Sequence, residues 1–180
     1  MTDGLRLSRA KLLSSIFCVP VMEDAAAMLE SYARDPEVTR FLAWKPLQSL
    51  EEAEKAIRSR VEGWRKGVSF SWTIRLREGG DLAGTISLRP QGMRLNMGFV
   101  VARPYWGRGY TTEAARPVVE WALAQPDIYR VSAVCDTENL ASARVLEKIG
   151  MQLEGTLRRW DVHPNISDAP RDCLCYAAVK

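Results

Sequence analysis

Residues 97–114 read MGFVVARPYWGRGYTTEA, and this stretch decides the fold. Its apolar first part predicts a strand that ends at Val101, and the residues after Gly109 predict a helix. Gly107 and Gly109 allow the turn between them to bring its main chain close to a ligand, because glycine has no Cβ. The start of the helix gathers unpaired backbone N–H groups and the positive end of a dipole, which suits a phosphate or pyrophosphate. Further donors in this turn are Arg108, Thr111 and Thr112.

Two familiar phosphate-binding motifs do not fit this turn. A P-loop needs a lysine and then serine or threonine directly after its last glycine, whereas Tyr110 and Thr111 follow Gly109. The dinucleotide fingerprint needs a third glycine at the position of Thr112. The turn therefore predicts an anion site of another kind.

A second stretch, residues 139–151, reads NLASARVLEKIGM and is followed by LEGTLR at residues 153–158. Together with residues 97–114 it resembles the cofactor-side motifs of the GCN5-related N-acetyltransferases (GNAT), and especially the branch that includes the ribosomal-protein N-terminal acetyltransferases. Weaker similarity at residues 23–25, 35–38 and 44–46 extends the resemblance over nearly the whole chain. Each motif alone is common, but the pair in this order is specific.

This resemblance implies a single α/β (α+β) domain over residues 1–180. Its central sheet would be mixed but mostly antiparallel, with about six to seven strands and about four flanking helices. The sheet would splay where strand 95–101 meets strand 131–135, and acetyl-CoA would bind there as co-substrate. The implied reaction is direct transfer of the acetyl group to a primary amine, a protein N-terminus or a small molecule, in a ternary complex. A coenzyme A-binding sensor without catalysis is the alternative.

The resemblance also assigns residues to the cofactor. The main chain of Phe99, Val100 and Val101 would receive the pantetheine arm like an added strand, and one backbone N–H there would stabilise the oxyanion. Asn139 would contact the cofactor while also capping a helix, and Ser142, one turn later, would protonate the departing thiolate. The pyrophosphate and its surroundings would be held by Trp106, Gly107, Arg108, Gly109, Tyr110, Thr111 and Thr112.

Two positions depart from the pattern of the family, and the identity of the general base is left open. Leu146 stands where many relatives have a tyrosine as general acid, so that the proton would come from Ser142 or water. Asn96 replaces an acidic residue and, as a neutral amide, cannot be a base. The general base would then be Asp161, His163 or water. Trp44 and Trp160 are expected to wall the acceptor site. Trp44 lies between the first two helices, where this fold usually builds that pocket, and Trp160 lies beside Asp161.

The remaining elements follow from hydrophobic periodicity and turn residues. A capping-box pattern begins a helix at Ser49, with Ala53, Ile57, Val61 and Trp64 as its apolar stripe and Gly67 at its end. Pro117 predicts a kink or a later start in the helix from about residue 109. Other strands are predicted at residues 16–21, 70–76, 82–88, 155–162 and 174–179, and other helices at residues 25–32 and 139–149.

Composition narrows the classes of function. The chain has 180 residues, 25 Lys and Arg, 22 Asp and Glu, and a net charge of +3, which does not favour a nucleic-acid partner. Its one histidine excludes a multi-histidine metal site, and no apolar run is long enough for a membrane span. We therefore expect a cytoplasmic protein, monomer or homodimer, without a metal. The four cysteines are expected to be reduced: Cys18, Cys135, Cys173 and Cys175.

Overall fold

The computed structural model describes residues 15–180, which form one seven-stranded sheet in the order β1-β2-β3-β4-β5-β7-β6. The strands are β1 (Ser15–Cys18), β2 (Phe70–Leu76), β3 (Leu82–Gln91), β4 (Arg94–Val101), β5 (Arg130–Asp136), β6 (Gln152–Asp161) and β7 (Arg171–Val179). The helices are α1 (Asp24–Met28), α2 (Pro36–Thr39), α3 (Leu50–Lys66), α4 (Tyr110–Ala124) and α5 (Leu140–Lys148), with a π-helical turn, η1 (Leu29–Ala33), and a 3-10 turn, η2 (Arg103–Tyr105).

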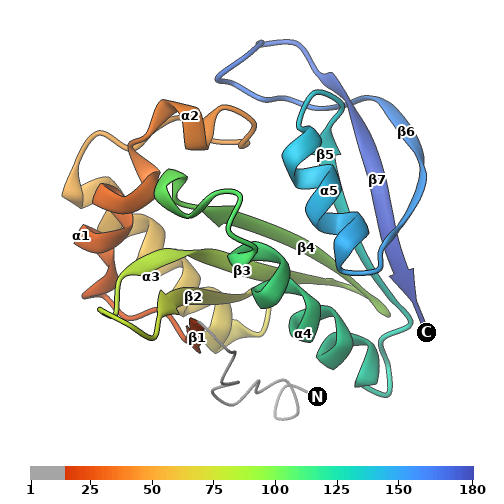
Figure 1. Ribbon diagram of the computed structural model, residues 1–180, viewed down its shortest axis with the longest axis horizontal. Helices are drawn as coiled ribbons and strands as arrows, with labels where there is room; N and C mark the ends of the chain where they lie inside the picture. Colours follow the sequence, from red (N-terminus) through yellow and green to blue (C-terminus); the bar gives the residue numbers. More distant parts are fainter. Residues whose placement is uncertain (1–14) are drawn as a thin grey trace.

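The sheet is mixed because only β4 and β5 run parallel. They pair only through Arg94–Asn96 and Arg130–Ser132, whereas the β3–β4 and β5–β7 ladders continue to the ends of these strands. Figure 1 shows β4 and β5 close together at one end and diverging toward the other. The predicted splayed, mostly antiparallel sheet is confirmed, with seven strands.

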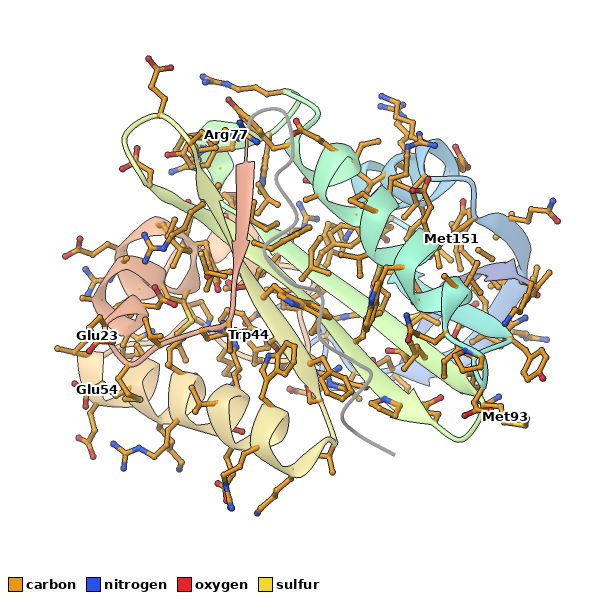
Figure 2. The ribbon with its side chains drawn as sticks, turned by 90° about the horizontal axis from the view of Figure 1, so that it is seen from below. Glu23, Trp44, Glu54, Arg77, Met93 and Met151 are labelled. Carbon is orange, nitrogen blue, oxygen red and sulfur yellow. The ribbon has the colours of Figure 1, made fainter. Side chains whose placement is uncertain are left out.

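Helices cover both faces of the sheet, and α3 and α4 lie on opposite sides of the strands in Figure 2. The larger core cluster joins α4 and α5 to the sheet, and the smaller one joins α1, η1 and α3 to β3. Trp72 is 1% exposed and packs edge to face against Trp64 and Trp121, with ring centroids 5.2 and 6.1 Å away. These aromatic residues of β2, α3 and α4 therefore pack as one group.

The N-terminal part is more irregular than its periodicity predicts. The first strand is four residues long and ends at Cys18 rather than residue 21. The first helix changes to π geometry after Met28, where the N–H of Arg34 donates to the carbonyl of Leu29 at 3.3 Å. Asp35 ends this helix and caps α2, accepting from the N–H of Glu37 at 2.9 Å.

Helix α3 begins and ends as the sequence predicts, but one residue of its inner face differs. Ser49 Oγ accepts from the N–H of Glu52 at 3.2 Å, and Gly67 ends the helix with a φ of 69°. Val61, expected on the buried stripe, is 38% exposed, and Arg60 contacts β3 instead. The prediction for Val61 is wrong because Arg60 lies seven residues, about two turns, after the buried Ala53, so that position 60 shares its face and position 61 is turned away from it.

The helix after the glycine turn begins at Tyr110, so of the two outcomes predicted for Pro117, a kink or a later start, the later start is wrong. Pro117 lies inside α4 and removes one backbone donor, while Ala114, Ala115, Val118 and Val119 of the same helix are buried. Burial of this apolar face offsets the lost hydrogen bond, because apolar area contributes about 25 cal/mol per Å².

Candidate functional site

A cavity of about 660 Å³ passes through the gap between β4 and β5. It exists because the parallel pairing ends after Asn96, which leaves the far ends of the two strands apart. Side chains reach it from both layers, so that it opens toward α5 on one side and toward α3 on the other. Among the predicted site residues, it brings together Phe99, Val100, Asn139, Ser142, Trp44, Asp161 and His163.

Alternate residues of β4 direct their backbone N–H and C=O groups into this gap. The N–H of Ala102 donates to the carbonyl of Ala83 at 2.8 Å. Successive residues of an antiparallel ladder point their N–H and C=O groups to opposite sides. The groups of Phe99 and Val101 therefore point into the gap, and those of Val100 point toward β3. The carbonyl of Val101 accepts from Trp106 Nε1 at 2.7 Å, which leaves its N–H and both groups of Phe99 facing the gap.

The glycine turn beyond β4 has the backbone conformation that the sequence predicts. Gly107 and Gly109 have φ values of 73° and 83°, in the left-handed region that favours glycine. The first hydrogen bond of α4 runs from the N–H of Glu113 to the carbonyl of Gly109 at 2.9 Å. Within residues 15–180, the N–H groups of residues 107–112 donate to no protein acceptor. This run of open donors at a helix start suits an anion.

Helix α5 presents its first turn to the cavity. Asn139 caps the helix, its Oδ1 accepting from the N–H of Ser142 at 3.2 Å, and both residues line the cavity. Burial raises the pKa of the neighbouring Cys135 thiol to about 11, although a hydrogen bond with Ser142 opposes this. One turn further, Leu146 is fully buried and lines the cavity, so that this position offers no hydroxyl.

Asp161 and His163 reach the cavity from the end of β6. Asp161 Oδ1 accepts from the N–H of Val162 at 2.9 Å. His163 is only 5% exposed; its Nε2 lies 3.6 Å from Asp136 Oδ2 and 3.8 Å from Cys173 Sγ. Its Nδ1 is buried and has no hydrogen-bond partner among the described residues. Both candidates for the general base thus lie at the same cavity.

The carboxylate beside His163 belongs to an ion pair between Asp136 and Arg171, which the sequence analysis did not predict. Arg171 holds Asp136 with Nε at 2.6 Å from Oδ2 and Nη2 at 3.2 Å from Oδ1. Burial alone would raise the pKa of Asp136, but the hydrogen bonds from Arg171 hold it below its ordinary value. The sequence feature that could have indicated this pair is the position of Asp136, at the end of an otherwise mostly apolar strand.

One side of the cavity is walled by the segment between α2 and α3. Asn165 Nδ2 donates to the carbonyls of Thr39 and Trp44 at 2.7 and 2.8 Å, which ties the β6–β7 connection to this segment. Trp44 lines the cavity, and its role in binding the acceptor stays a prediction. Trp160 does not line it and is 58% exposed, because β6 is irregular between Leu157 and Asp161.

The described residues contain no group of three or more His, Cys, Asp or Glu side chains arranged for a metal ion. The cysteines among them are free. No helix within residues 15–180 combines the length and the apolar character needed to cross a membrane.

Comparisons with known proteins agree with this geometry. The family model of the acetyltransferase (GNAT) domain matches residues 17–152. The uncharacterized N-acetyltransferase YoaA of Bacillus subtilis is 30% identical over 161 residues, covering 88% of this chain and 89% of YoaA. The microcin C7 self-immunity acetyltransferase MccE, solved with acetyl-CoA and AMP, superposes with a TM-score of 0.87 at 17% identity, over 98% of this chain and 99% of MccE. An acetyltransferase from Salmonella typhimurium that modifies the N-terminal serine of ribosomal protein L7/L12 has a TM-score of 0.82 at 16% identity, over 93% and 96%.

Proposed function

The chain belongs to the GNAT acetyltransferase family, and we propose that it transfers an acetyl group from acetyl-CoA directly to a primary amine while both substrates are bound. The observation that carries this proposal is the single cavity through the splayed sheet. On one side it meets the open main chain of β4 and the start of α5, and on the other it meets Asp161 and His163.

The chain's own residues fit the acyl donor. We assign the pantetheine arm to the gap-facing backbone groups of Phe99 and Val101, as for an added strand. The open N–H groups of residues 107–112, with Arg108 beside them, would hold the pyrophosphate. When bound, acetyl-CoA supplies an activated thioester carbonyl. The N–H of Val101 or Phe99 would donate to the oxygen of that carbonyl as negative charge develops on it.

Two proton movements remain for side chains. The amine must lose a proton as its nitrogen forms the new bond to the acetyl carbon, and Asp161 and His163 are the groups at the cavity that can take it. The sulfur must gain a proton as the carbon–sulfur bond breaks. Ser142 is the hydroxyl on α5 that lines the cavity, and water is the alternative donor, since Leu146 has none.

Direct transfer is favoured over an acyl-cysteine intermediate. A cysteine nucleophile needs a histidine in which one ring nitrogen accepts the thiol proton while the other ring nitrogen donates to an orienting carboxylate. Here Cys173 and Asp136 both approach Nε2 of His163, and Nδ1 faces neither. Burial also raises the pKa of Cys173 to about 11, so that its thiolate is scarce at neutral pH.

We propose that the acceptor is a protein N-terminal amine or a small amine. The Salmonella enzyme modifies an N-terminal serine, and MccE was solved with the small molecules acetyl-CoA and AMP. Release of free thiol from acetyl-CoA, measured over a panel of amines and N-terminal peptides, tests the proposal, together with thermal stabilisation by coenzyme A. Stabilisation without turnover on any amine would instead support a coenzyme A sensor, the reading that Leu146 favours. If coenzyme A does not stabilise the protein and no amine is turned over, both the acetyltransferase and the sensor are refuted.

A further inference from the structure

We propose that the acceptor amine carries an oxyanion, a carboxylate or a phosphate, and that Arg60 binds it. This inference rests on the proposed function, since it concerns the acceptor side of the same cavity. Arg60 lies on the inner face of α3, lines the cavity and is half-buried. An arginine at an inward position loses hydration, and this cost is usually offset by a carboxylate.

The partners of Arg60 within the protein are neutral. Its Nη1 lies 3.2 Å from Tyr32 Oη, 3.3 Å from Thr85 Oγ1 and 3.2 Å from Met28 Sδ. No carboxylate among residues 15–180 forms an ion pair with it, and its Nε and Nη2 donate to no acceptor in that part of the chain. The guanidinium is thus held in place by Nη1, while the other edge keeps the paired donors that bind a carboxylate or phosphate.

Arg60 is also close to the reacting part of the cavity. Thr85, which it contacts, is the register partner of Val100 on β4, and Val100 lines the gap. Adjacent strands are about 4.8 Å apart. The gap lies on the far side of β4 from β3. The fixed charge is therefore about two strand spacings, on the order of 10 Å, from the place where the acyl group is proposed to lie, within reach of a group on a small acceptor.

The charges of the cavity agree with an anionic acceptor. The lining residues with a fixed charge are Arg60, Arg89 and Asp161, two cations and one anion. An acceptor with an amine toward Asp161 and an oxyanion toward Arg60 matches this arrangement, whereas a polyamine or an aminoglycoside would bring further positive charge to it. Apolar walls from Met28 and Phe41 leave room for an apolar body.

The test compares amines that differ only in the oxyanion. The wild-type protein is assayed by thiol release with L-methionine and L-methioninamide, with phosphoethanolamine and ethanolamine, and with spermidine. We expect higher kcat/KM for at least one oxyanion-bearing amine than for its neutral partner. This preference would oppose intrinsic reactivity, because the amide has the more easily deprotonated amine. The methionine and phosphoethanolamine arms distinguish a carboxylate from a phosphate. Equal or better use of the neutral amines or of spermidine would overturn the proposal.

Variants assign the preference to Arg60. Arg60→Met keeps much of the side-chain volume, and we expect it to lower kcat/KM for the preferred acid by about 10–100-fold, mainly through KM, with KM for acetyl-CoA unchanged. Arg60→Lys keeps the charge and should retain part of the preference. Arg58→Met, on the exposed side of the same helix, is the matched control. Equal losses in the Arg58 and Arg60 variants would contradict the assignment.

If the protein turns over none of these amines, a binding measurement tests the role of Arg60. Calorimetry of the coenzyme A complex with N-acetyl-L-methionine and with its amide should then show tighter binding of the acid, lost in Arg60→Met. Equal affinity, or no binding of either, would overturn the inference while coenzyme A binding still supports the family site. If coenzyme A itself does not bind, the proposed function fails, and this inference fails with it.

Discussion

The Nε2 atom of His163 lies 3.6 Å from Oδ2 of Asp136, a carboxylate that is fully buried and held by Arg171. A carboxylate beside one ring nitrogen favours a proton on that nitrogen, which leaves Nδ1 as the acceptor. The ring is also enclosed, so its orientation is set by packing. Among residues 15–180, the carboxylate of Asp161 accepts a hydrogen bond only from the N–H of its neighbour Val162. The two candidates for the base therefore differ in how firmly they are positioned.

Asp161→Asn should lower kcat by about 10²–10⁴-fold if Asp161 is the base, because an amide cannot accept the proton of the amine. KM for acetyl-CoA should change little. The pH–rate profiles of Asp161→Asn and His163→Gln, measured side by side, check the assignment. A profile that keeps its acidic limb in Asp161→Asn but loses it in His163→Gln would give the role to His163.

The pair of Asp136 and Arg171 should make stability depend on acid pH. Because the folded protein holds the pKa of Asp136 below its ordinary value of 3.8, the ionised carboxylate stabilises the fold above that value. This stabilisation is lost as pH falls through the lower folded pKa. Denaturant titrations between neutral and acid pH should show it, and Asp136→Asn should flatten the pH dependence in the acid range. A variant with the wild-type slope would contradict this origin.

At neutral pH, Asp136→Asn should destabilise the fold by about 3 kcal/mol, since it leaves the guanidinium of Arg171 without its main partner. The value is at the low end for a buried pair because Arg171 keeps Glu138 at 2.9 Å. Glu138→Gln removes that more exposed contact and should cost less than about 1 kcal/mol. Equal losses in the two variants would show that burial of Asp136 does not matter.

Cys173→Ala should retain turnover, because the proposed transfer forms no bond to sulfur. The raised pKa values of Cys135 and Cys173, about 11 for each, also predict slow alkylation at pH 8, with the partly exposed Cys175 as the internal reference. Peptide mass spectrometry after brief iodoacetamide treatment measures this order. Loss of activity in Cys173→Ala, together with trapping of an acetyl-cysteine, would overturn direct transfer.

Gly84→Ala should disturb the β3–β4 ladder at the edge of the cavity. A Cβ there would lie 2.3 Å from the carbonyl oxygen of Val100, and backbone must move to relieve it. We expect a loss of about 1–3 kcal/mol in stability. Gly98→Ala is the matched control for stability, since its Cβ would meet only Ser87 Oγ, at 3.6 Å. Thermal or denaturant unfolding of both variants decides, and equal stability would refute the steric argument.

The sequence predicted the parts of this protein that depend on neighbouring residues. The cap at Ser49, the left-handed glycines at positions 67, 107 and 109, and the strand-turn-helix of residues 97–114 each follow from contacts within a few residues. Hydrophobic alternation also located β2, β3 and β4, although their ends moved by up to three residues. The family resemblance added the mixed, mostly antiparallel sheet and the gap between strands 95–101 and 131–135, which no local pattern contains.

Only the tertiary structure decided how distant side chains meet. Arg60 contacts Tyr32, which is 28 residues away, and Arg171 holds Asp136 across 35 residues. The stripe on α3 pointed to Val61 because apolar character was its sole criterion, and hydrogen bonds to Tyr32 and Thr85 place the arginine inward instead. His163 is buried for the same reason, since its neighbours come from β5 and β7. A charge or ring is placed by partners that the fold brings together, and these partners are not adjacent in the sequence.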